Sequence, residues 1–150
     1  MTENKISIGI VCVFVFTLFF ADIGNTDSSA QWILYGTSEM GDSYYNKSSI
    51  TEVSPKIIQL WNKDKYSEIG KNLIIQGRIN YNLPVDGYDK LDYVTDILEL
   101  DCVNKTIKDI FFVEYNDKDE VLFEFDIPNP KVSQAAPSSI QETLLKKICL

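Results

Sequence analysis

Two cysteines, Cys102 and Cys149, constrain the fold of this 150-residue chain more than any other feature. Cys102 closes the segment 94–102 (VTDILELDC), in which apolar and polar side chains alternate. Such alternation is typical of a strand with one face on a core, and Cys102 falls on the inward face together with Leu100. Asp96 is the exception, because it is a polar residue at an inward position.

The segment around Cys149 (SSIQETLLKKIC) predicts a C-terminal helix. Ser139 and Glu142 have the spacing of a capping box, in which the two side chains satisfy free backbone N–H groups at the helix start. The apolar side chains recur every four residues and form one stripe: Ile140, Leu144 and Ile148. Cys149 lies beside that stripe, so the surface that packs on a sheet also carries the thiol.

The N-terminus carries a targeting signal. Residues 6–21 form an uncharged apolar run whose helix would be roughly 24 Å long, which is short of the ~30 Å hydrocarbon core of a bilayer. Ser28 and Ala30 supply the small side chains that signal peptidase requires before its cut. We therefore expect residues 1–30 to be a signal peptide and residues 31–150 to be the mature domain. An uncleaved membrane anchor is the alternative.

Removal of that segment also removes Cys12, which leaves two cysteines, as expected of a secreted domain with one disulfide. We predict the pair Cys102–Cys149, which links the helix to the sheet. Two free thiols, or a redox or metal-binding pair, are the rival interpretation. The chain has no histidine, so two cysteines cannot complete an ordinary zinc site.

The composition excludes several classes of function. A net charge of −8 argues against a nucleic-acid partner, because binding to phosphates depends on clustered Lys and Arg. The absence of histidine removes the commonest general base and metal ligand, and no nucleophile has a recognisable base beside it. We predict no enzymatic activity and no cofactor. The length suits one domain.

Between the signal segment and the helix the chain is rich in strand patterns, separated by turn residues. The fold class predicted is α+β: a single small domain with a meander-like antiparallel sheet of about five to six strands and a C-terminal helix packed on it. For the segment 73–80 a short helix is the alternative. A loop is expected over 82–92 and an irregular connection over 127–137. The candidate strands are 32–36, 43–46, 56–63, 73–80, 94–102, 106–115 and 121–125.

The order of several short motifs resembles the bacterial surface-adhesin E domain family. The motifs are WILYG, YYNKSSI, IIQLW, LELDCVNKTI, FFVEYNDKDEV and PSSIQETLLKKIC, and residues 67–92 show no motif that matches. The resemblance implies a signal peptide, an antiparallel sheet and a disulfide from strand to C-terminal helix, with adhesion to host or matrix proteins for the named member. The positions that carry it are Tyr44, Tyr45, Ser49, Ile50, Asp101, Cys102, Pro137, Ser139, Ile140 and Cys149.

One loop offers a candidate binding surface. Its carboxylates at a spacing of three suggest a cation site, although solvated loop charges are the simpler explanation. The two tyrosines in or beside the loop suggest contact with a partner, because Tyr is enriched at interface hot spots. The residues of this candidate surface are Tyr81, Asp86, Tyr88, Asp89 and Asp92. The single arginine among fourteen basic residues supports no phosphate-binding site.

Two functions follow from these observations. The first is an exported binding or adhesion module that holds a protein partner with a sheet face or the 86–92 loop, in the periplasm, at the outer surface or outside the cell. The second is a structural or assembly component of the envelope that acts through strand edges or as a homo-oligomer. Membrane contact is expected only if residues 1–30 are retained.

Overall fold

The structure is a computed structural model that describes residues 31–150. The predicted signal peptide lies outside the described residues. The elements in chain order are β1 (Trp32–Ser38), β2 (Gly41–Asn46), the 3₁₀ turn η1 (Lys47–Ser49), β3 (Thr51–Ser54), β4 (Ile57–Tyr66), α1 (Glu68–Asn80), η2 (Tyr88–Lys90), β5 (Leu91–Asp101), β6 (Thr106–Asn116), β7 (Val121–Asp126), β8 (Ser133–Gln134) and α2 (Ile140–Ile148).

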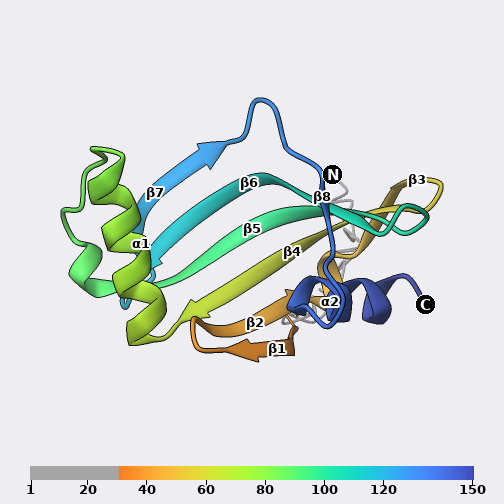
Figure 1. Ribbon diagram of the computed structural model, residues 1–150, viewed down its shortest axis with the longest axis horizontal. Coiled ribbons are helices and arrows are strands. Elements are labelled where there is room, and N and C mark those ends of the chain that lie inside the picture. Colours follow the sequence, from red (N-terminus) through yellow and green to blue (C-terminus); the bar gives the residue numbers. More distant parts are fainter. Residues whose placement is uncertain (1–30) are drawn as a thin grey trace, which may run out of the picture.

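The strands form one antiparallel sheet in the order β1-β2-β4-β5-β6-β7 (Figure 1). The strands of this path follow one another in chain order, except that the short strand β3 lies between β2 and β4 in the chain and pairs with β4. The short strand β8 pairs with β6. The predicted α+β class, the antiparallel meander and the C-terminal helix are confirmed. The sheet has eight strands rather than five or six, because β3 and β8 are exposed and too short to show alternation.

The strand predicted at 73–80 is wrong, because this segment is the second half of helix α1. The Ser67 hydroxyl caps the helix by accepting from the backbone N–H of Gly70 at 3.1 Å. Gly70, Ile74 and Arg78 then recur every four residues on the inward side. The β-propensity of Leu-Ile-Ile is therefore overridden by the cap and by packing on the sheet.

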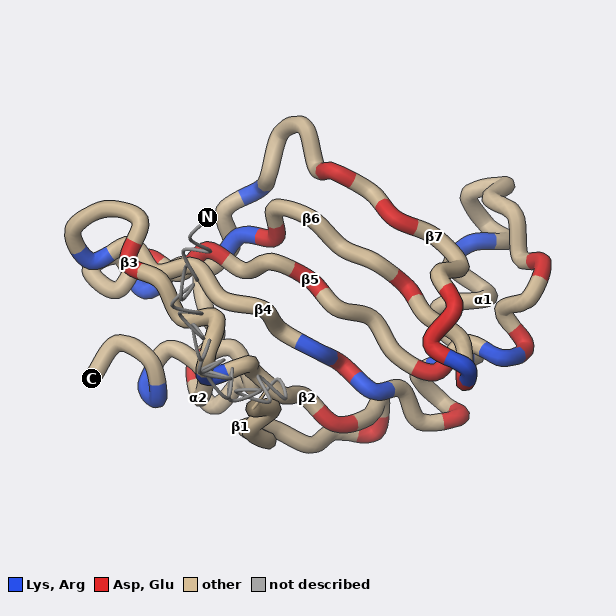
Figure 2. The backbone as a smooth tube through the Cα atoms, turned by 180° about the vertical axis from the view of Figure 1, so that it is seen from behind, with Lys and Arg blue, Asp and Glu red and all other residues tan. Residues whose placement is uncertain are grey.

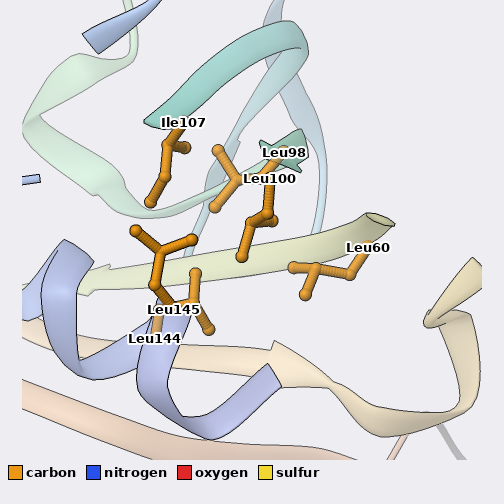
Figure 3. Close-up of a cluster of buried hydrophobic side chains, with 6 residues drawn as sticks. All are labelled: Leu60, Leu98, Leu100, Ile107, Leu144 and Leu145. Carbon is orange, nitrogen blue, oxygen red and sulfur yellow. The ribbon is translucent and has the colours of Figure 1, made fainter. Parts of the chain in front are cut away.

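Helix α2 packs its leucines against the sheet. Six buried side chains from β4, β5, β6 and α2 form this core: Leu60, Leu98, Leu100, Ile107, Leu144 and Leu145 (Figure 3). The Ser139 hydroxyl caps α2, and the Glu142 carboxylate accepts from the N–H of Ser138, one residue earlier than in the usual box. The disulfide Cys102–Cys149 is present, which confirms the predicted pairing.

Both helices lie on one face of the sheet, at opposite ends (Figure 1). Helix α2 covers the end near β1, and α1 reaches the same face at the other end through Arg78, which contacts Glu114 on β6. Seen from behind, strands β4 to β7 have no helix of residues 31–150 in front of them (Figure 2). We call the two sides the helix-bearing face and the open face. No helix in the described range is both long and apolar enough to cross a membrane.

Candidate functional site

The open face carries several large aromatic side chains of the sheet. Tyr93 and Tyr115 are directly opposed on β5 and β6 and stack at 4.7 Å between ring centroids. Trp61 on β4 meets Phe111 on β6 edge to face at 6.1 Å. Such pairs stabilise a sheet by cross-strand contact. The residues of the open face that concern us are Trp32, Leu34, Tyr44, Trp61, Lys63, Tyr93, Ile97, Phe111 and Tyr115.

A single lysine joins these aromatic pairs. The Lys63 ammonium lies 3.7 Å from the ring centroid of Tyr93 and 5.8 Å from that of Trp32. Burial lowers the pKa of Lys63, because desolvation disfavours its charged form. The open face therefore presents aromatic rings around a cation, and aromatic residues are enriched at protein interfaces.

The helix-bearing face has a cavity beside the start of α2. Its volume is about 460 Å³, and it extends from the β1–β2 turn to the start of α2. Polar side chains from the sheet line one part, and apolar groups line the rest. The residues that concern its chemistry are Tyr35, Met40, Ser43, Asp64, Tyr66 and Ile140.

Three carboxylates come together beside this cavity. Asn62 on β4 pairs with Asp96 on β5, and Asp64 follows two residues later on the same face. On β6, Asp109 is opposite Leu98, which makes it a diagonal neighbour of Asp96. Diagonal neighbours in a sheet lie roughly 7–8 Å apart. A bulge in β6 follows Asp109 directly, and bulges are frequent where a side chain must be re-aimed.

These carboxylates hold protons more tightly than ordinary ones. Burial, together with the nearby charge of Asp64, raises the pKa of Asp96 to about 8. Burial also raises the pKa values of Asp64 and Asp109. For Asp64, hydrogen bonds from Ser43 and Asn62 oppose that rise. The cluster therefore resists full ionisation at neutral pH.

The hydrogen bonds of this cluster leave one atom without a partner. The Tyr35 hydroxyl donates to Oδ1 of Asn62 at 2.8 Å, and Nδ2 of Asn62 donates to Oδ2 of Asp64 at 3.0 Å. Oδ1 of Asp96 is shielded from solvent and accepts no hydrogen bond within residues 31–150. Buried polar atoms are nearly always paired, so an unpaired one marks a place of interest.

The predicted loop surface does not assemble as one site. Tyr81 is 80% exposed, and Asp86 and Asp89 are exposed on the loop. Asp92, by contrast, is on β5 and pairs with Lys65 at 3.3 Å. Tyr88 is only 2% exposed, so a partner on the surface does not reach its ring.

Tyr88 is buried because it belongs to an internal cluster around the only arginine. Its hydroxyl donates to Oε2 of Glu114, and Nη1 of Arg78 lies 3.2 Å from the same oxygen. Nε of Arg78 donates to the carbonyl of Pro84 at 2.8 Å. The guanidinium also stacks over the rings of Tyr88 and Phe123. This cluster fastens α1 and the following loop to the sheet.

Sequence reasoning missed the carboxylate cluster, although one signal pointed to it. Asp96 interrupts the inward apolar positions of its strand, and an inward polar residue must be paired, protonated or functional. Its neighbours Asp64 and Asp109 come from other strands, so only the register brings them to it. Across residues 31–150, no group of three or more acidic or cysteine side chains is close enough to hold a metal ion.

A known protein family matches this chain. The model of the family "Surface-adhesin protein E" matches residues 32–150, which is the whole described domain apart from its first residue. The chain belongs to the surface-adhesin protein E family. This confirms the resemblance seen in the sequence motifs and makes the chain an adhesion-type surface protein. It also favours the prediction of a non-enzymatic role. No curated protein matches the chain significantly.

Solved structures of Haemophilus influenzae protein E share the fold. Crystal form II of that protein is 14% identical, with a TM-score of 0.51, and the match covers 81% of this chain and 87% of the other. Protein E from non-typeable Haemophilus influenzae is also 14% identical, with a TM-score of 0.51 and coverage of 83% and 78%. At this identity the likeness shows the fold alone.

Proposed function

We propose that the chain is an exported adhesion module that binds a protein partner through the open face. The observation that carries this proposal is the row of aromatic side chains around Lys63 on a sheet face that no helix of the described domain covers. Tyr and Trp are enriched among the residues that dominate binding energy where a partner desolvates them. Family membership supports adhesion as the purpose of that contact.

Binding of the mature domain to immobilised extracellular-matrix proteins tests the open face. We compare the native domain with Tyr44→Ser and Lys63→Gln, which change the open face, and with Tyr81→Ala, which changes an exposed loop tyrosine. We expect at least a tenfold loss of affinity in the first two variants, as for interface hot spots. Tyr81→Ala should bind like the native domain.

The reverse pattern would contradict the proposal. If Tyr81→Ala lost binding while both open-face variants kept it, the 81–92 loop would be the contact surface. Thermal unfolding of every variant shows whether it is still folded, which must be checked because Tyr44 and Lys63 are both half-buried. Binding by none of the four proteins to any member of the panel would also count against adhesion to matrix proteins.

Export is the second part of the proposal. Residues 1–30 have the apolar run and the small residues of a cleaved signal. Intact mass measurement under non-reducing conditions should give a mature protein that begins at Gln31 and lacks two hydrogens because of the disulfide. A mass that includes residues 1–30 would instead indicate a membrane anchor, and reduced protein in the cytoplasm would contradict export.

One observation favours assembly through a strand edge as a second candidate function. β1 lies at one end of the sheet order and its sequence, WILYGTS, contains no charge or proline. The opposite end, β7, carries Glu124 and Asp126, and charges on an edge strand discourage pairing. If β1 pairs with a second copy, light scattering of the mature domain should show a dimer. Leu34→Lys should then return it to a monomer.

A further inference from the structure

Lys63 is a cation on the open face that has no ion pair within residues 31–150. The other two lysines on the strands of this face are paired, Lys65 with Asp92 at 3.3 Å and Lys108 with Glu99. Each of these two pairs is neutral as a whole. The positive charge of Lys63 is therefore the one that a partner on this face can pair with.

The surroundings of the Lys63 ammonium suit an added carboxylate. The nearest ring is that of Tyr93, whose hydroxyl donates to Oδ1 of Asp119 at 2.8 Å. Burial lowers the pKa of Lys63, and the charge of Asp119 opposes that shift only in part. A carboxylate from a partner would offset the remaining cost of desolvating the ammonium.

Apolar side chains extend from Lys63 across the sheet, and we call this set the cross-strand band. It runs from β1 to β6, across the strands rather than along them. All of its side chains are exposed or half-buried, so a partner can reach them. The band consists of two rows of register partners, Leu34, Tyr44 and Lys63 in the first and Trp61, Ile97 and Phe111 in the second.

The borders of the band define the chemistry of its partner. The pair of Glu99 and Lys108 lies on one side and the pair of Lys65 and Asp92 on the other. Charges of the partner would meet neutral pairs at these borders, whereas a carboxylate over the band would meet Lys63. The complementary surface is therefore apolar with one acidic side chain within it.

The shape of the band favours a helix as the partner element. Five neighbouring strands about 4.8 Å apart make it roughly 19 Å long, which matches a helix of about 13 residues. Its two rows are about 7 Å apart, so a helix about 10 Å wide covers both. An extended segment on this face would leave its backbone groups unpaired, because those of the sheet already bond to one another. A helix pairs its own.

We propose that the protein partner lays an amphipathic α-helix across the cross-strand band and places a carboxylate against the Lys63 ammonium. This inference rests on the open face as the contact surface of the proposed function. It adds the class of element that the partner contributes and the charge at its centre.

NMR titration of the isotope-labelled mature domain with synthetic peptides tests this proposal. The Glu peptide is a lactam-stapled helix of about 14 residues with leucines along one side and one glutamate in the middle of that side. The Gln peptide differs only in glutamine at that position, and the strand peptide alternates leucine and threonine. At physiological ionic strength we expect saturable shifts over residues 61–63 and 95–97 with the Glu peptide. The Gln peptide should bind at least tenfold more weakly.

Matched variants assign the difference between the two helical peptides to one residue. Lys63→Met keeps an apolar stem without the charge, and it should bind the Glu and Gln peptides within twofold of each other. Lys65→Met, which removes an exposed and paired charge, should keep the tenfold difference. A merely structural role of Lys63 would instead weaken both peptides alike. The comparison of the two peptides on the native domain provides the test if Lys63→Met does not fold.

Four results would overturn the proposal. These are the absence of saturable shifts with the Glu peptide, equal affinity of the native domain for the Glu and Gln peptides, tighter binding of the strand peptide, and an equal loss of both helical peptides in Lys63→Met. A mature domain that is already dimeric and shows no shifts with the Glu peptide would assign the band to a second copy of the chain.

The failure of this proposal is distinguishable from the failure of the proposed adhesion. If Tyr44→Ser and Lys63→Gln lose binding to matrix proteins while the Glu peptide does not bind the native domain, the open face remains the contact surface and only the helical partner is overturned. If the Glu peptide binds as expected and no matrix protein does, this inference stands and adhesion to matrix proteins is contradicted.

Discussion

At the scale of single residues, Asp96 is a polar residue at an inward strand position, and this position changes its pKa. Its place on the inward side of β5 puts a carboxylate where its neighbours Val94 and Leu98 are buried. Burial raises its pKa to about 8, against an ordinary value of about 3.9. The charges of Asp64 and Asp109 on this face add to the shift. Burial raises the pKa of the Tyr35 hydroxyl, so Tyr35 does not ionise at the pH values where Asp96 titrates.

This shift predicts a pH-dependent stability. Between about pH 4 and pH 8 the folded protein keeps a proton that the unfolded chain has released, so the free energy of unfolding falls as pH rises through this range. Asp96→Asn carries no charge at any pH and should be the more stable protein at pH 8.5, by about 1–3 kcal/mol. The two proteins should differ less at pH 5. Urea unfolding at both pH values measures this.

Asp86→Asn, on the exposed loop, is the control for that experiment and should follow the native protein at both pH values. Asp64 and Asp109 also have raised pKa values, so some pH dependence of the same sign should remain in Asp96→Asn. If the native protein and Asp96→Asn kept a constant difference from pH 5 to pH 8.5, Asp96 would not be the titrating group.

Arg78 shows a buried charge that is fully paired. Its side chain is 9% exposed and that of Glu114 is 8% exposed. Glu114→Gln would leave the arginine charge without a counter-ion and should lower the free energy of unfolding by about 3–5 kcal/mol. The exposed pair of Lys71 and Glu68 provides the comparison. Glu68→Gln should have little effect, and similar losses in both variants would argue against a special role for the buried pair.

At the scale of elements, α1 depends on one glycine and merely tolerates another. Gly70 faces the β1–β2 turn so closely that an added Cβ would lie 2.1 Å from the carbonyl oxygen of Met40. A Cβ at Gly77 would meet nothing within 4 Å. The difference shows that the start of the helix is set by contact with the sheet, whereas its middle is not.

The two glycines therefore predict opposite effects of the same substitution. Gly70→Ala must displace backbone and should destabilise the domain by about 1–3 kcal/mol. Gly77→Ala should stabilise it by about 1 kcal/mol, because alanine favours a helix interior. Thermal unfolding of the two variants measures both signs. A stabilising Gly70→Ala would show that α1 can move away from the turn at no cost.

At the scale of the whole molecule, the disulfide ties the last helix to the centre of the sheet. Cys102 follows β5 and Cys149 caps α2, and the chain between them, with a sequence separation of 47, includes β6, β7, β8 and α2. Helix α2 is also held by Leu144 and Leu145 in the core. The bridge and the leucines thus secure the same contact in two different ways.

Removal of the disulfide should weaken the domain without abolishing its fold. In the chain-entropy model, a closed loop of this length contributes about 4 kcal/mol. Cys102→Ser/Cys149→Ser should lose about that much stability in urea unfolding, and the native protein in reductant should match it. Leu144→Ala with the disulfide intact provides a comparison of similar expected size. No change in the double variant would mean that the unfolded chain gains nothing from release of the bridge.

The sequence by itself determined those features that depend on near neighbours along the chain. Alternation predicted β5 and β6, the capping residue Ser139 and the apolar stripe predicted α2, and the cysteine count predicted the disulfide. Only the tertiary structure decided that residues 73–80 belong to a helix, because Leu-Ile-Ile suits either element and the contact of Gly70 with the β1–β2 turn lies outside the segment. The same holds for the carboxylate cluster and the Arg78 pair. Each joins residues from different elements, and strand register is what places them together.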